Sequence, residues 1–110
     1  MWILDPGDPF PRLTLDIIEW AQAMDGTHNI VEKTRLVSPN LPKPIVVSTV
    51  FLGMVHGYDS QSRPLLFETM VFGGKCDGYC ERCATWTEAV TQHNIAVVRV
   101  KVSDEKLEKE

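Results

Sequence analysis

The chain has 110 residues, of which 44% are hydrophobic and 24% are charged, and its formal net charge is −4. This size and composition predict one soluble globular domain over residues 1–110, with a single hydrophobic core. The negative charge argues against binding to duplex nucleic acid, which requires a cationic surface, and no apolar run of about 18 residues predicts a membrane span.

Residues 1–12 contain three prolines and no periodic pattern, so they predict an irregular arm. Either this arm is frayed, or it lays apolar side chains across the core, namely Trp2, Ile3, Leu4 and Phe10. The arm has no basic region followed by an apolar stretch, which argues against a signal peptide. Because the three cysteines are an odd number, we expect reduced thiols, as in a cytoplasm.

The segment TLDIIEWAQAMDG predicts a helix that begins at an N-cap residue, Thr14, and ends at Gly26. Its apolar residues recur at helical spacing and share one face: Leu13, Ile17, Trp20, Ala21 and Met24. We expect this face to pack on the sheet that the following segments predict.

Four segments after this helix predict β-strands. Residues 30–37 alternate between two faces, which is typical of a strand. Residues 45–56 are the strongest candidate and are apolar on both sides, so we expect an interior strand with both faces covered. Residues 65–72 and 79–84 predict the third and fourth strands. The loops between the first three strands are SPNLPKP and GYDSQSRP.

The last helix is predicted by a capping box, in which Thr85 and Glu88 each bond the backbone amide of the other. Its apolar face comprises Trp86, Ala89, Val90, His93, Val97 and Val100. Residues 95–102 also alternate as a strand would, but we favour helix because the periodic face runs through them. Residues 103–110 predict a charged, solvated tail.

The order helix, four strands, helix predicts an α+β fold. Because the connections are short, we expect a four-stranded antiparallel meander with the N-terminal and C-terminal helices packed on it. The strand at 45–56 would be interior, and the strands at 30–37 and 79–84 would be the edges. Exposed edges invite pairing, and we expect a symmetric homodimer.

Three segments, VSTVFLGMVHGY, PLLFETMVFGG and YCERCATWTEAVTQH, resemble a family of small proteins encoded by tailed phages and prophages. The resemblance covers residues 14 to about 100, and LLFETMVFGG is its most specific part. The chain departs from the family in the SPNLPKP loop and in Cys83, where the family has an aromatic residue. The resemblance implies a phage accessory protein, in the host cytoplasm or in the virion, and implies no catalytic residue.

The segment GGKCDGYCERC poses the question of a metal or redox site. Cys76, Cys80, Cys83 and His93 are the candidate ligands for zinc, but their spacing is not that of a standard zinc site. Cys80 and Cys83 are three positions apart, so on a strand they point to opposite faces. A redox pair would place the first thiol at a helix N-terminus, and here the helix follows the second. We therefore expect no metal and no cofactor.

Other polar residues fit structural roles. His93 on the apolar helix face is expected to be a hydrogen-bonded core residue, and Glu68 is expected to pair with Arg82 on the next strand. A buried Glu68 would also suit a general acid or base, but no nucleophile accompanies it. The chain has no phosphate-binding loop and no serine or metalloprotease motif. The alternative of a small enzyme or metal protein rests on these residues and the cysteines.

The function that the sequence favours is a non-enzymatic interaction with a host or phage protein, without nucleic acid or membrane. Because loops on a rigid scaffold carry function, we expect the partner to contact SPNLPKP and GYDSQSRP. The candidate interaction residues in these loops are Lys43, Tyr58, Asp59 and Arg63.

Overall fold

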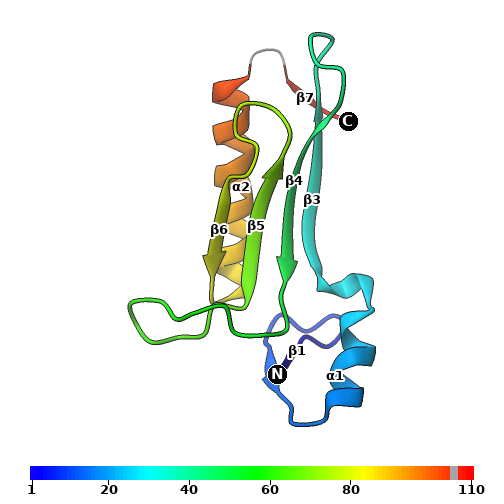
Figure 1. The fold of residues 1–110 in the computed structure, drawn as a ribbon, viewed down its shortest axis with the longest axis vertical. Helices are drawn as coiled ribbons and strands as arrows, with labels where there is room; N and C mark the ends of the chain where they lie inside the picture. Colours follow the sequence, from blue (N-terminus) through cyan, green and yellow to red (C-terminus); the bar gives the residue numbers. More distant parts are fainter. Residues whose placement is uncertain (105–106) are drawn as a thin grey trace.

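The computed structural model describes residues 1–104 and 107–110 as an elongated molecule with extents of 48 × 30 × 20 Å (Figure 1). The helices are α1 (Ile17–Met24), α2 (Trp86–Ser103) and the short 3-10 helix η1 (Thr27–Asn29). The strands are β1 (Trp2–Ile3), β2 (Arg12–Leu13), β3 (Ile30–Val37), β4 (Ile45–Phe51), β5 (Phe67–Phe72), β6 (Cys80–Cys83) and β7 (Glu108–Lys109).

The main sheet has the strand order β6-β5-β4-β3-β7, and every pairing in it is antiparallel. The predicted α+β class and the antiparallel sheet are therefore confirmed. The prediction of four strands with 30–37 at one edge is wrong, because β7 pairs with the outer side of β3 and adds a fifth strand there. Strand β4 lies in the interior, as predicted. Its buried and half-buried residues alternate along the strand, so one face of the sheet is covered and the other is open.

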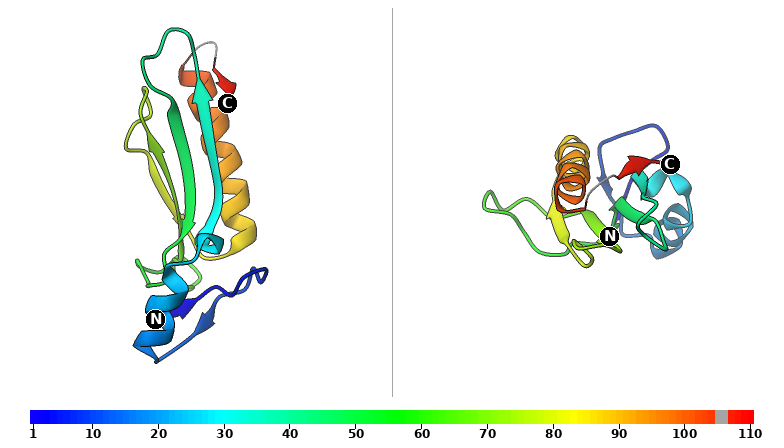
Figure 2. Two further views of the ribbon diagram at one scale, coloured as in Figure 1. Left: turned by 90° about the vertical axis from the view of Figure 1, so that its right-hand side faces the viewer. Right: turned by 90° about the horizontal axis from the view of Figure 1, so that it is seen from above.

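Helix α2 covers only one face of this sheet (Figure 2). The expectation that both faces of β4 are covered is wrong, because α1 lies beyond the end of the sheet (Figure 1). There α1 packs against β1, and the Trp20 indole donates a hydrogen bond to the Gly53 carbonyl at 3.0 Å. The open face carries the half-buried Val46 and Val50 of β4 and the exposed Phe72 of β5.

Helix α1 begins two residues later than predicted. The N-cap is Asp16, whose Oδ1 accepts hydrogen bonds from the amides of Ile18 and Glu19 at 3.0 and 3.2 Å. Thr14 instead accepts from the Asp16 amide and donates to Glu19. No residue of α1 is buried, because a helix of this length packs one side against β1 and leaves Ile17 and Ile18 exposed.

The predicted capping box is present at the start of α2, with one of its two hydrogen bonds changed. The Thr85 hydroxyl accepts from the Glu88 amide at 3.2 Å and donates to the Glu88 carboxylate at 3.0 Å, so the return bond reaches the hydroxyl rather than the amide. Residues 95–102 are helical, as favoured. The helix buries Ala89, His93, Ala96, Val97 and Val100 against the sheet.

Both chain ends are more ordered than predicted. The N-terminal arm is a hairpin in which β1 pairs with β2, Ile3 and Leu4 are buried, and Arg12 bonds Asp5 at 2.7 Å. Residues 103–110 are not simply a solvated tail. Ser103 ends α2, residues 105–106 lie outside the described residues, and β7 pairs with the end of β3 while half-buried Leu107 packs on the core.

Candidate functional site

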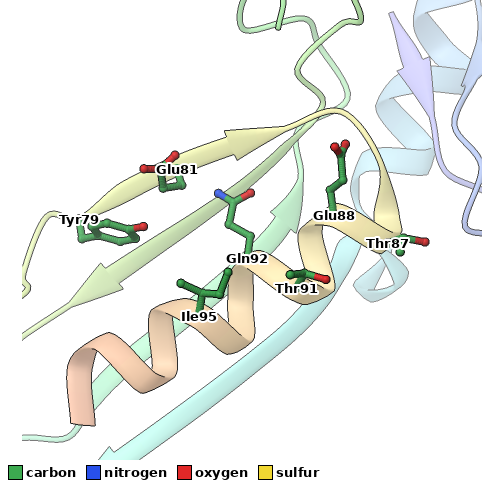
Figure 3. Close-up of a pocket in the computed structure, with 7 residues that line it drawn as sticks. All are labelled: Tyr79, Glu81, Thr87, Glu88, Thr91, Gln92 and Ile95. Atoms are coloured by element: carbon green, nitrogen blue, oxygen red, sulfur yellow. The ribbon is translucent and has the colours of Figure 1, made fainter. Parts of the chain in front are cut away.

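A groove runs between α2 and the edge strand β6, which lie side by side in the fold (Figure 1). It forms a hollow of about 390 Å³. Figure 3 shows the residues that line this α2–β6 groove: Tyr79, Glu81, Thr87, Glu88, Thr91, Gln92 and Ile95. Because β6 is the last strand of the sheet, the groove lies at the sheet edge.

The outer edge of β6 presents backbone hydrogen-bonding groups. The Tyr79 carbonyl accepts from the Val71 amide at 3.0 Å, and the Cys83 carbonyl accepts from the Leu66 amide at 3.1 Å. Alternate residues from 79 to 83 therefore turn their backbone polar groups toward β5. The amides and carbonyls of Cys80 and Arg82, which lie between them, point to the free edge.

The two carboxylates of the groove, Glu88 and Glu81, differ in whether a cationic side chain pairs with them. Glu88 accepts from Arg63 at 2.9 Å, and this bond lowers its pKa. Among the described residues, no Lys, Arg or His nitrogen lies within 4.0 Å of the Glu81 carboxylate. Burial raises the pKa of Tyr79, and the nearby charge of Glu81 adds to this effect. Glu81 is therefore the groove carboxylate that has no ion-pair partner within 4.0 Å among the described residues.

The floor and the wall of the groove come from α2. Gln92 extends toward the β6 side (Figure 3), and its buried Nε2 finds no hydrogen-bond partner in the described part of the chain. Ile95 is 53% exposed and continues into a second shallow hollow that Val98 also lines. On the other side, the Arg99 guanidinium stacks 4.8 Å from the Tyr79 ring centroid and holds that ring in place.

The structure separates the cysteines that the sequence singled out. Cys80 pairs with Met70 on the open face of the sheet, whereas Cys83 pairs with Phe67 on the covered face, as their spacing predicted. Cys76 lies near the end of α2, with its sulfur 3.4 Å from the Ser103 hydroxyl. Among the described residues, no three His, Cys, Asp or Glu side chains form a group that could hold a metal ion.

The thiols of the CxxC pair are not activated. Burial raises the pKa of Cys83 to about 11, and burial followed by the charge of Glu68 raises the pKa of Cys80. Both side chains are therefore protonated at neutral pH, whereas thiol–disulfide chemistry requires a thiolate. This arrangement gives no support to a redox function.

His93 is a core residue, as expected. It is fully buried, and its two ring nitrogens lie 2.8 Å from the hydroxyl oxygens of Thr34 and Thr49. The Thr49 hydroxyl also bonds Thr69 at 2.7 Å. Because both nitrogens are occupied within the core, His93 cannot join the cysteines as a metal ligand without breaking this network.

Glu68 and Arg82 form the predicted cross-strand pair, at 2.8 Å between Oε2 and Nε. They lie on the open face of the sheet, where Glu68 pairs in register with Val50 of β4. The carboxylate is thus held by a cation and lies on the face opposite His93. The structure brings no pair of groups together here that would act as acid and nucleophile.

The two loops expected to face a partner lie at opposite ends of the sheet (Figure 1). Successive connections of a meander alternate between the two ends, so Lys43 is far from Tyr58, Asp59 and Arg63. Arg63 pairs with Asp59 at 2.7 Å and with Glu88 at 2.9 Å, and it ties its loop to the start of α2. A partner that contacts both loops would therefore have to span the length of the sheet, and their role in binding stays a prediction.

The groove residues were not predicted from the sequence. One pattern in α2 could have indicated the groove. Three apolar residues lie at helical spacing outside the buried face and are 53%, 60% and 80% exposed: Ile95, Val98 and Val102. Nothing in the sequence indicated that Tyr79 and Glu81 line a groove, because this depends on which helix lies beside β6.

Comparison with protein-family models, with curated proteins and with solved structures gives no match. Within the described residues, neither helix combines the length and the apolar character needed to cross a membrane.

Proposed function

We propose that this protein is a non-enzymatic interaction protein that binds an extended segment of a partner protein as an added strand on β6. The observation that carries the proposal is the free edge of β6, with its Cys80 and Arg82 backbone groups, lying directly beside the α2–β6 groove. In strand addition, main-chain hydrogen bonds supply affinity and pockets for alternate side chains supply specificity.

The groove suits an added strand for two reasons. Every second side chain of such a strand would point toward α2 and enter the hollow. The buried Nε2 of Gln92, unpaired among the described residues, is a donor that an acceptor on the bound segment can satisfy. The alternative of an enzyme or metal protein has less support, because Cys76, Cys80, Cys83, His93 and Glu68 are dispersed over the core and both faces of the sheet.

The biological setting is proposed on the sequence resemblance alone. It makes the partner a host or phage protein and places the interaction in the host cytoplasm or the virion. The symmetric homodimer also remains a prediction, and its test is sedimentation equilibrium over a range of protein concentrations. A partner that adds to β6 requires no dimer.

The test begins with selection of peptides of about ten random residues, long enough for a strand of five or six, by ribosome display on the immobilised full chain. Enriched peptides are then measured against two variants. Arg82→Ala removes the ion pair with Glu68 and keeps the backbone amide, whereas Arg82→Pro also removes the amide that points to the free edge. An edge strand tolerates proline when its amide faces outward.

We expect Arg82→Pro to bind the selected peptides at least about tenfold more weakly than Arg82→Ala. Amide exchange at Cys80 and Arg82 should also slow when peptide is added. If the two variants bind alike, or if no peptide is enriched over the Arg82→Pro chain, strand addition on β6 is wrong.

A further inference from the structure

The groove beside β6 has a chemical preference of its own. We infer that it selects an extended segment carrying lysine or arginine, with the cationic side chain placed opposite Glu81. This inference rests on the strand-addition proposal, and it names the class of partner that the edge would take.

The geometry of an added strand fixes what lies opposite Glu81. Because the Glu81 backbone bonds toward β5, an antiparallel segment on the other side meets it as a non-hydrogen-bonded pair. In such pairs the two Cβ atoms are about 4.5–5.5 Å apart, closer than in hydrogen-bonded pairs. Glu81 faces the α2 side of the sheet, since its partner on β5 is the buried Thr69. The opposing side chain must therefore enter the groove.

The charge of the groove favours a cation there. Glu88 is already occupied by Arg63 and by the Thr85 hydroxyl, at 2.9 and 3.0 Å. Glu81 has no Lys, Arg or His partner within 4.0 Å among the described residues, and its charge and its hydrogen bond with Tyr79 both contribute to the raised pKa of Tyr79. An incoming carboxylate would add a second negative charge without an ion pair to the same hollow, whereas a lysine or arginine would pair with the first.

The walls of the groove can pack against the aliphatic part of a lysine or arginine side chain. The ring of Tyr79 and the exposed Ile95 form apolar surfaces beside Glu81 (Figure 3). Lysine and arginine bury an aliphatic stem along such surfaces while their charged ends reach a polar group. A short polar side chain would leave these surfaces uncovered.

A second copy of β6 does not fit the same position. Its side chains on the α2 side are Glu81 and Cys83, preceded by Tyr79, and none of them is cationic. Antiparallel pairing of two β6 strands centred on Glu81 would place the two carboxylates directly opposite each other, which is destabilising. The occupant is therefore a segment of another protein.

The test repeats the peptide selection on Glu81→Gln and Glu81→Lys chains, with Glu108→Gln as control. Glu108 is exposed on β7, and its substitution by glutamine changes the net charge as much as Glu81→Gln does, but away from the groove. We expect wild-type and Glu108→Gln chains to enrich lysine or arginine at one fixed position. Glu81→Lys should enrich aspartate or glutamate at that position instead.

For an enriched peptide, we expect Glu81→Gln to weaken binding about threefold to fivefold, and Glu108→Gln to leave it unchanged. Replacing the peptide's cationic residue by glutamine should abolish the difference between wild type and Glu81→Gln. If the enriched peptides carry no fixed cation and bind Glu81→Gln as tightly as wild type, the preference is wrong. Strand addition still stands in that case, provided that Arg82→Pro abolishes binding and Arg82→Ala does not.

Discussion

The buried imidazole of His93 should make the protein less stable in mildly acidic solution. Its ring nitrogens each bond a threonine hydroxyl at 2.8 Å inside the core, and the side chain is fully buried. Burial is the main cause that lowers the pKa of His93 below its ordinary value of 6.5. Glu32, 3.9 Å away, opposes this effect, and the charge of Lys109 adds to it.

The sign of the effect follows from proton linkage. As pH falls below about 6.5, His93 of the unfolded chain binds a proton, whereas the folded chain does not until its own lower pKa is reached. The free energy of unfolding therefore decreases with falling pH over this window, by up to about 1.4 kcal/mol per pH unit. Between pH 7 and 5.5, the loss from this one group is at most about 1.3 kcal/mol.

The assay is urea unfolding followed by far-UV circular dichroism at several pH values from about 7 to 5.5, on wild type and His93→Gln. Glutamine can donate and accept hydrogen bonds but does not titrate. We expect the variant to be less stable at pH 7 by about 1–3 kcal/mol and to show a flatter pH dependence.

NMR provides a check that requires no variant, since the His93 ring signals in the folded protein should titrate at a lower pH than those of an ordinary imidazole. The reasoning is refuted if wild type gains stability relative to His93→Gln as the pH falls. It is also refuted if the His93 ring titrates in the folded protein at its ordinary pKa.

Three further substitutions test how the elements are held together. Thr85→Ala removes the N-cap of α2 and should cost about 0.5–2 kcal/mol in urea unfolding; an unchanged midpoint would mean that the cap does not stabilise the helix. Gly74→Ala should destabilise more than Gly78→Ala, because both backbones have positive φ (69° and 86°) but only a Cβ at 74 meets neighbours, the buried Ile45 side chain and the Asp104 carboxylate; equal costs would contradict the close contact. Arg63→Glu should lower the thermal midpoint because it breaks the contacts to Asp59 and Glu88, whereas Lys43→Glu in an exposed loop should not; equal midpoints would show that the Arg63 contacts add no stability.

Local features were predictable because their causes lie within a few residues. The capping box at Thr85 depends on Glu88 three positions later, and the start of α2 was placed correctly. The Glu68–Arg82 pair followed from the short connection between β5 and β6, which leaves few possible registers. The start of α1 was predicted two residues early because Thr14 and Asp16 are both good caps, and local sequence does not choose between them.

The sequence by itself determined the α+β class, the antiparallel pairing of the central strands and the long last helix, since these depend on periodicity, capping and short connections. Only the tertiary structure decided which surfaces are covered, because packing between distant segments is not encoded in a local pattern. It placed α1 beyond the sheet and left one sheet face open. It also paired β7 with β3, although the charged sequence of the tail has no pattern that predicts a strand.

The same limit applies to the candidate site and to the polar core. The α2–β6 groove exists because α2 lies alongside β6, which brings Gln92 and Ile95 opposite Tyr79 and Glu81. Thr49 and Thr69 are polar residues within apolar strands, so residue type alone would not assign them to the core. They are fully buried because their hydroxyls bond each other and the Thr49 hydroxyl also bonds the imidazole of His93, 44 residues further along the chain. A buried polar group is stable only when its partners are present, and the fold supplies those partners.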